Sequence, residues 1–187
     1  MKIYLAGPDV FLPDAIEIGR RKCEICARHG VIGLYPLDNT VDLSARDASL
    51  RIFKGNEAMM DAADAIIANL TPFRGPSADA GTVYELGYAA GRGKFCLAYS
   101  NDPTPYPERA ARMTPVTKSR DGRLIDGDGL TIENFGWSDN LMMIHALDLH
   151  GRPLVTPAQA PADIWRDLTA FEACVRLAAG RAAGTSS

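Results

Sequence analysis

The 187-residue sequence has no apolar run near the roughly 20 residues that span a bilayer. Its first residues turn polar too soon for a signal peptide. Basic residues are not in excess, because 20 Lys and Arg stand against 23 Asp and Glu. No nucleic-acid-binding surface is therefore indicated. We expect a cytoplasmic protein that uses neither a membrane nor a nucleic acid as partner.

Signatures of bound cofactors are also missing. No G-x-G-x-x-G follows the first apolar run, which disfavours dinucleotide binding. Gly93-Lys94 does not belong to a P-loop, since Tyr88 and Phe95 occupy positions that the motif reserves for Gly and Ser or Thr. The three histidines form no ligand-like cluster, so no metal is expected. Cys23-x-x-Cys26 is the one hint of a redox carrier, and it falls within a predicted helix.

Short apolar segments alternate with helical patterns over the first hundred residues. Strands are predicted at 2–6, 31–35, 65–70 and 95–99, and helices at 13–28, 44–62 (with a break near Gly55) and 77–91. The alternation predicts an α/β fold, a doubly wound flavodoxin- or Rossmann-like parallel sheet flanked by helices. One domain is expected over residues 1–179, followed by a disordered tail at 180–187.

The region 101–136 departs from this alternation. It is rich in proline, and Asp121-Gly122 between two short extended runs predicts an inserted hairpin or a long functional loop. Ser138 is expected to cap a helix over 140–147, and a last helix is expected over 161–179.

Carboxylates are common where the predicted strands end, and ligands of open parallel sheets bind beyond those ends. The segments concerned are Gly7–Asp9, Pro36–Asn39, Thr71–Gly75 and Ser100–Asp102, with Arg74 as their one cation. Glu85 lies just beyond, inside a run of small and apolar residues. Either Thr82-x-x-Glu85 is a capping box, or Asp79 caps the helix and Glu85 faces a ligand, with small residues one turn away on either side.

The pattern Asp79-x-Gly81-Thr82-x-x-Glu85-x-Gly87 resembles the nucleophile motif of the nucleoside 2-deoxyribosyltransferases. Further stretches resemble this family in the same order, over about residues 2 to 147: 2–8, 36–39, 63–75 and 134–142. The similarity is closest to the purine-leaning branch known from kinetoplastids. Each motif is short, but the ordered combination is specific.

The resemblance implies a role for each matching residue. Glu85 would attack the anomeric carbon of a 2'-deoxynucleoside, and the hydroxyl of Tyr4 would orient its carboxylate. Asp79 would hold the 5'-hydroxyl. Asn140 and Met142 would reach the same site from a neighbouring subunit. This implies a homo-oligomer (dimer-based, up to a tetramer or hexamer) with shared sites, acting on 2'-deoxynucleosides and free nucleobases without a cofactor.

The base-binding side is less complete. Asn56 stands where many family members carry an Asp that protonates the leaving base, and an amide cannot act as that acid. Glu57 and Asp9 are the alternative proton donors, whereas Asp64 is expected to be structural. Gly7, in the turn after the first predicted strand, is also expected to bind the substrate. Aromatic residues that could stack on the base, or equally pack in the core, are Phe11, Phe73, Phe135 and Trp137.

The predicted reaction is transfer of 2-deoxyribose between nucleobases, with purines favoured, by double displacement through a covalent deoxyribosyl-glutamate. A carboxylate suits this chemistry because it stabilises an oxocarbenium-like state and then traps it. One alternative is an N-glycosidase acting on deoxynucleosides or their 5'-monophosphates, although Asp79 would repel a phosphate. Another is a noncatalytic nucleoside-binding module.

Overall fold

The computed structural model describes residues 1–38, 42 and 44–184. Four parallel strands form its main sheet in the order β2-β1-β3-β4, namely β1 Lys2–Ala6, β2 Ile32–Leu34, β3 Ala65–Asn69 and β4 Phe95–Tyr99. The prediction of a parallel α/β sheet is confirmed. The strand order reverses between β1 and β3, and such a switch point opens a crevice for ligands.

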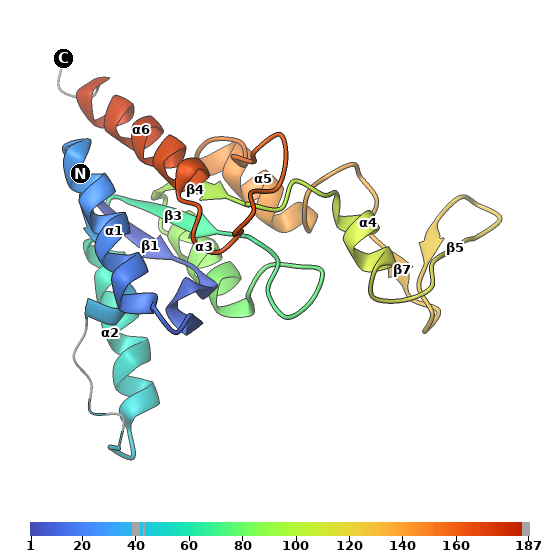
Figure 1. Cartoon of the computed structure of the whole chain (residues 1–187), viewed down its shortest axis with the longest axis horizontal. Helices are drawn as coiled ribbons and strands as arrows, with labels where there is room; N and C mark the ends of the chain where they lie inside the picture. The colour runs from blue at the N-terminus through green and yellow to red at the C-terminus, as the bar shows by residue number, and fades with distance from the viewer. Residues whose placement is uncertain (39–41, 43, 185–187) are drawn as a thin grey trace.

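Helices cover both faces of the sheet (Figure 1). The helices α1 (Ala15–Arg28) and α6 (Thr169–Gly184) pack on one face. The other face carries α2 (Ala48–Ala62), α3 (Ala80–Gly91) and α5 (Leu141–His150). Because both faces are covered, every residue of β3 and β4 is buried, which explains why these strands are continuous apolar runs.

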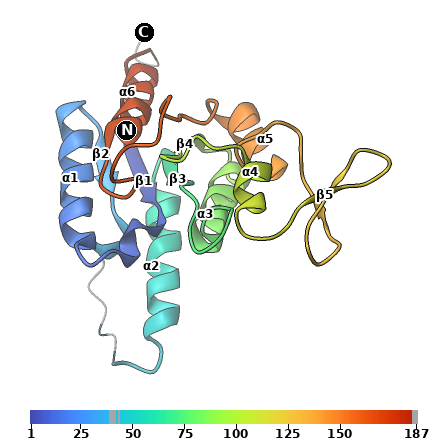
Figure 2. The same cartoon turned by 45° about the vertical axis from the view of Figure 1, so that its right-hand side comes forward.

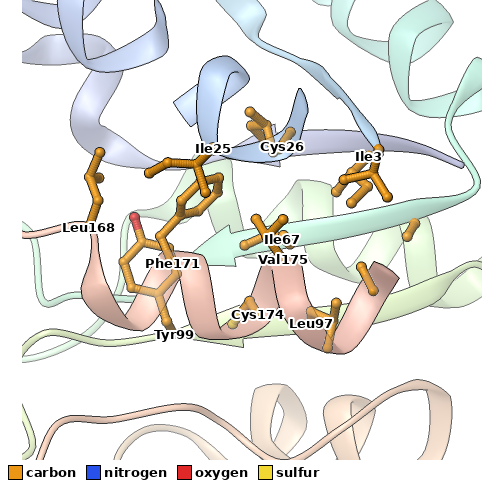
Figure 3. Close-up of a cluster of buried hydrophobic side chains, with 14 of the residues drawn as sticks. Ile3, Ile25, Cys26, Ile67, Leu97, Tyr99, Leu168, Phe171, Cys174 and Val175 are labelled. Carbon is orange, nitrogen blue, oxygen red and sulfur yellow. The ribbon is translucent and has the colours of Figure 1, made fainter. Parts of the chain in front are cut away.

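The core beneath α1 and α6 shows how the layers are held together (Figure 3). Phe171 and Val175, one turn apart on α6, face Ile67 of β3 and Leu97 of β4, while Ile25 approaches from α1. Side chains three to four positions apart share one side of a helix, so the apolar pattern of α6 lies against the sheet.

The last helix differs from its prediction at both ends. It begins at Thr169, since the carboxylate of Asp163 accepts hydrogen bonds from the backbone N–H of Trp165 and Arg166 and forms a separate turn. It ends at Gly184, so residues 180–184 are helical and the predicted tail is wrong there. Residues 185–187 lie outside the described residues, as does Asn39.

Two other helix starts also differ. The first turn of α5 is capped by Asn140, whose side chain accepts from the backbone N–H of Met142 at 3.0 Å, and not by Ser138. Helix α2 begins after Asp47 and continues through Gly55 without a break. A single glycine only weakens a helix, and packing of α2 against β1 and the turn after β2 outweighs that cost.

The inserted region has the hairpin that its sequence predicts. After α4 (Tyr106–Ala111), strands β5 (Thr117–Lys118), β6 (Leu124–Ile125) and β7 (Thr131–Ile132) form a small antiparallel sheet. Gly122 adopts φ +87° in the first turn, a conformation that suits glycine. This sheet projects away from the main body (Figures 1 and 2). No helix within the described ranges is both long and apolar enough to cross a membrane.

Candidate active site

A cavity of about 330 Å³ opens beside the carboxyl ends of β1 and β2. The turn after β1, the turn after β2, helix α2 and the start of α3 enclose it. The residues that line it are Gly7, Val10, Phe11, Pro36, Leu37, Ile52, Asn56, Asp79, Gly81, Thr82 and Glu85. The fold therefore brings four of the predicted site residues together with Glu85, namely Gly7, Phe11, Asn56 and Asp79.

Glu85 and Tyr4 meet at this cavity. Tyr4 lies in the fully buried middle of β1, and its hydroxyl donates a hydrogen bond of 2.6 Å to Oε1 of Glu85. Glu85 occupies the second turn of α3, on the side that faces the sheet. This hydrogen bond ties one oxygen of the Glu85 carboxylate to the central strand.

The cavity perturbs the acidity of both groups. The pKa of Glu85 is raised to about 7: burial is the largest cause, the hydrogen bond from Tyr4 opposes it, and the carboxylates of Asp79 and Asp9 add to the rise. Burial and the adjacent Glu85 raise the pKa of Tyr4 well above its usual value. Tyr4 is therefore a neutral donor near pH 7, while Glu85 is poised between its protonated and ionised forms. Such perturbed groups are typical of active sites.

Asp79 has a structural and an exposed side. Its Oδ2 caps α3 by accepting from the backbone N–H of Thr82 at 2.9 Å and from the Thr82 hydroxyl at 3.0 Å. Asp79 is thus the cap, as the second interpretation of the motif holds, and the capping box at Thr82 is wrong. Within the described part of the chain Oδ1 accepts no hydrogen bond, which leaves it open to a ligand. A Cβ at Gly81 would lie 3.1 Å from Oδ2, so glycine keeps the space beside this carboxylate clear.

Asn56 reaches the cavity from α2, one turn after Ile52. Its Oδ1 is buried and finds no partner among the described residues. A buried acceptor without a donor is costly, so this atom is available to a hydrogen-bond donor of a ligand. Sequence analysis did not predict that Ile52 lines the cavity. The i, i+4 spacing of Ile52 and Asn56 could have shown it, because this spacing places both side chains on one face of a helix.

Neither alternative proton donor lines the cavity. Asp9 is completely buried behind the turn, where it accepts from Lys22 at 2.7 Å, Asn69 at 3.1 Å and Tyr35 at 3.3 Å. This ion pair with Lys22 was not foreseen, because nothing local marks a lysine in an amphipathic helix as buried. At Gly7 a Cβ would lie 2.4 Å from Oδ1 of Asp9, so the turn can pack closely only around glycine.

Glu57, the second alternative proton donor, and Asp64, which was expected to be structural, each accept a hydrogen bond from another part of the chain. Glu57 lies outside the cavity lining and accepts a hydrogen bond from the hydroxyl of Tyr84. Asp64 accepts from the backbone N–H of Lys2 at 2.7 Å, a contact that ties β3 to β1.

Aromatic rings border the cavity on one side. Phe11 lines it and is 57% exposed. The ring of Phe73 stacks on Phe11 at 5.4 Å, and Trp165 meets Phe73 edge to face at 6.0 Å. The guanidinium of Arg74 lies over both phenylalanine rings. Phe11 can therefore contact a ligand directly, whereas Phe73 and Trp165 support it from behind.

The remaining aromatic candidates and the residues expected from α5 lie elsewhere in the chain. Phe135 and Trp137 are outside the cavity, and Trp137 packs edge to face on His145 of α5. Asn140 and Met142 also lie outside it, at the start of α5. Met142 is 72% exposed and borders a second cavity of about 800 Å³ between α3 and α5. Within one chain, the fold does not bring them to Glu85.

A parallel sheet of flavodoxin-like order, with a half-buried carboxylate at a small-molecule cavity beside its switch point, defines an α/β enzyme that acts on a small substrate. Residues 3–142 match the family model Nucleoside 2-deoxyribosyltransferase. A structure of 2-desoxiribosyltransferase from Leishmania mexicana is 36% identical with a TM-score of 0.60, and the match covers 76% of this chain and 84% of that one.

Two further proteins are similar to this chain. An uncharacterized protein from Schizosaccharomyces pombe is 36% identical over 155 residues, which is 75% of this chain and 74% of that protein. A conserved protein from Enterococcus faecalis is 22% identical with a TM-score of 0.54, covers 84% of this chain and 91% of that one, and supports the fold alone. The chain belongs to the nucleoside 2-deoxyribosyltransferase family and is an enzyme of this type.

Proposed function

We propose that this enzyme moves 2-deoxyribose between purine bases by double displacement, with Glu85 as nucleophile. The observation that carries the proposal is the hydrogen bond from Tyr4 to Oε1 of Glu85 inside the cavity. Because Tyr4 occupies Oε1, the other carboxylate oxygen is left for the anomeric carbon. The preference for purines rests on the resemblance to the kinetoplastid branch.

The reaction has two balanced steps. Oε2 of Glu85 bonds to C1' of the sugar, and the bond from C1' to the base nitrogen breaks with its electron pair leaving on the base, which takes up one proton. A nitrogen of a second base then attacks C1' from the opposite side, loses its proton, and releases the Glu85 carboxylate. Two inversions retain the configuration at C1'. Tyr4 keeps its proton throughout and only orients the nucleophile.

Asp79 is assigned to the 5'-hydroxyl of the sugar through Oδ1, the oxygen that does not cap α3. Among the described lining residues none is Lys or Arg. A 5'-phosphate would therefore meet a carboxylate without a compensating cation, which favours nucleosides over their monophosphates.

The base is assigned to the side of the cavity bordered by Phe11 and Asn56. Phe11 lines the cavity with a largely exposed side chain that can pack against a base, and Phe73 stacks on its ring. The Asn56 amide can donate to a ring nitrogen and, through its unpartnered Oδ1, accept from an N–H group of the base. It cannot supply the proton that the leaving base requires, so this proton is assigned to solvent.

The surface between α3 and α5 is assigned to a second copy of the chain. Its cavity is lined mostly by apolar residues of the two helices, and Leu149 at its rim is 80% exposed. An apolar surface of this kind marks an interaction site. Covering it with a second subunit would bury Met142 and bring Asn140 close to the partner, as expected for shared active sites. We place this homo-oligomer in nucleoside salvage in the cytoplasm.

Chromatography of a reaction with deoxyinosine and free adenine tests the proposal, beside a sample without adenine. Deoxyadenosine should form with adenine, and little free deoxyribose should form without it. Equal release of deoxyribose in both samples would identify a hydrolase, and no turnover would favour a binding module. The variant Glu85→Ala should lose transfer, while Glu24→Ala on the surface of α1 should retain it. Intact mass spectrometry after mixing with deoxyinosine alone should detect one added deoxyribosyl group, absent in Glu85→Ala.

A further inference from the structure

The loop that leads into α3 is held at three consecutive residues directly before Asp79. The carbonyl of Pro76 accepts a hydrogen bond of 2.7 Å from Nε of Arg109. The hydroxyl of Ser77 donates to Oδ1 of Asp139 at 2.5 Å, and the backbone N–H of Ala78 donates to Oδ2 of Asp139 at 3.2 Å. The backbone on the N-terminal side of Asp79 is thus fixed by two side chains distant in sequence.

Those two side chains form a buried ion pair. The guanidinium of Arg109 lies 3.1 Å from Oδ2 of Asp139, and the two side chains are only 4% and 2% exposed. Arg109 also donates to the carbonyl of Ser138. The charges are paired and hydrogen-bonded, as buried charges must be. Since such pairs contribute little net stability compared with apolar residues, their presence favours a role in fixing a conformation.

The same cluster reaches the start of α5. Oδ1 of Asp139 accepts from the backbone N–H of Asn140 at 2.9 Å. Glu133, which follows β7 of the inserted region, accepts from the side-chain amide of Asn140 and from the backbone N–H of Leu141. The inserted region therefore contributes Arg109 and Glu133 to one network that ends at Ala78, directly before Asp79, on one side and at the first turn of α5 on the other.

We propose that Arg109 and Asp139 are positioning residues for the 5'-hydroxyl of the substrate, and that Arg109 is what the inserted region adds to catalysis. The inference rests on the proposed function, in which Asp79 holds that hydroxyl. Asp139 does not touch the substrate; it sets the path of residues 76–78 and thereby the position of the Asp79 carboxylate. A displacement of about 1 Å at such a contact can reduce the rate about 100-fold.

The test compares kcat/KM for 2'-deoxyinosine with kcat/KM for 2',5'-dideoxyinosine, which lacks the 5'-hydroxyl, with adenine as acceptor. The ratio of the two values measures what the 5'-hydroxyl contributes. Ser77→Ala removes one hydrogen bond without leaving a buried charge, and Asp139→Asn removes the charge at constant size. Asp79→Asn measures the loss of the direct contact between the Asp79 carboxylate and the 5'-hydroxyl. Glu172→Gln is the control, because this carboxylate pairs with His29 on the opposite face of the sheet.

In the wild type the ratio should be well above one, and Asp79→Asn should bring it close to one. Asp139→Asn should lower the ratio about tenfold and Ser77→Ala several-fold, mainly through the reaction of 2'-deoxyinosine. Glu172→Gln should leave it unchanged. If Asp139→Asn does not fold, Ser77→Ala decides. Equal losses for both substrates, with the ratio of the wild type retained, would overturn the positioning role and leave the proposed function intact. A wild-type ratio near one would instead refute the role of Asp79, and with it this inference.

Discussion

The hydroxyl of Tyr4 lies 2.6 Å from Oε1 of Glu85, although the two residues are 81 positions apart in the chain. One belongs to the central strand β1 and the other to the second turn of α3. The contact places a neutral donor against a carboxylate that burial makes a weaker acid. Because burial outweighs the hydrogen bond from Tyr4 and raises the pKa of Glu85 to about 7, this carboxyl group changes its charge in the neutral pH range.

The acid limb of the pH profile of kcat/KM should report the pKa of Glu85. Attack requires ionised Glu85, so kcat/KM should fall as the pH is lowered through about 7, the raised pKa of this group. Tyr4→Phe removes the hydrogen bond that favours the ionised form, so the limb should move to higher pH. Tyr88→Phe, whose hydroxyl contacts Asp61 instead, should not move it. A pH profile of kcat/KM checks this, and an unshifted limb in Tyr4→Phe would contradict the assignment.

Asp79→Asn should move the same limb in the opposite direction. The charge of Asp79 raises the pKa of Glu85, so its removal should shift the limb to lower pH. Asparagine is also a good N-cap, so α3 should remain intact. Circular dichroism controls for folding, and a shift to higher pH would show that the two carboxylates do not interact as described.

Stability should also depend on the charge of Glu85. Its pKa is raised in the folded state, so ionisation disfavours folding as the pH rises from about 4.5 to about 7. Glu85→Gln should therefore be more stable than the wild type at pH 8, by up to about 3 kcal/mol, while lacking transfer activity. The difference should largely disappear at pH 5, where Glu85 is protonated. Urea unfolding at both pH values measures it, and equal stability at pH 8 would contradict the buried environment of Glu85.

The ion pair behind the site should matter for folding. Lys22 and Asp9 are each 1% exposed and lie 2.7 Å apart. Lys22→Met leaves the Asp9 charge buried without its partner, which should cost about 3–5 kcal/mol. Adding Asp9→Asn should recover part of this loss. Arg51→Met, which breaks an exposed pair with Asp47, should cost about 1 kcal/mol or less. Urea unfolding compares the three, and equal effects of Lys22→Met and Arg51→Met would refute the buried pair.

The proposed subunit interface can be tested at Leu149. This residue is 80% exposed on α5, so Leu149→Asp should not unfold a single chain. It should nevertheless separate the oligomer into subunits and reduce transfer, because Asn140 and Met142 would no longer reach a partner. Leu130→Asp, at an exposed position of the inserted region, is the matched control. Light scattering with a parallel activity assay measures both effects, and a fully active monomer would overturn the shared site.

Local patterns predicted much of the fold. Continuous apolar runs marked β3 and β4 because helices cover both of their faces. The final helix was misplaced because Trp165 and Leu168 fit its apolar spacing, although the polar turn around Asp163 holds them outside it. The role of Asn140 as a cap was missed for a related reason, since Ser138 is an equally good capping residue by type.

The sequence by itself determined the order of strands and helices, the hairpin and the motif that contains Asp79 and Glu85, because these depend on periodicity and on residues near in the chain. Tertiary structure alone decided that Asp9 meets Lys22 and Arg109 meets Asp139, whereas the contact of Tyr4 with Glu85 was predicted only through the family resemblance. The physical reason is that burial and hydrogen-bond partners set the charge state and orientation of a side chain. Both are properties of the packed chain that no local pattern of residues contains.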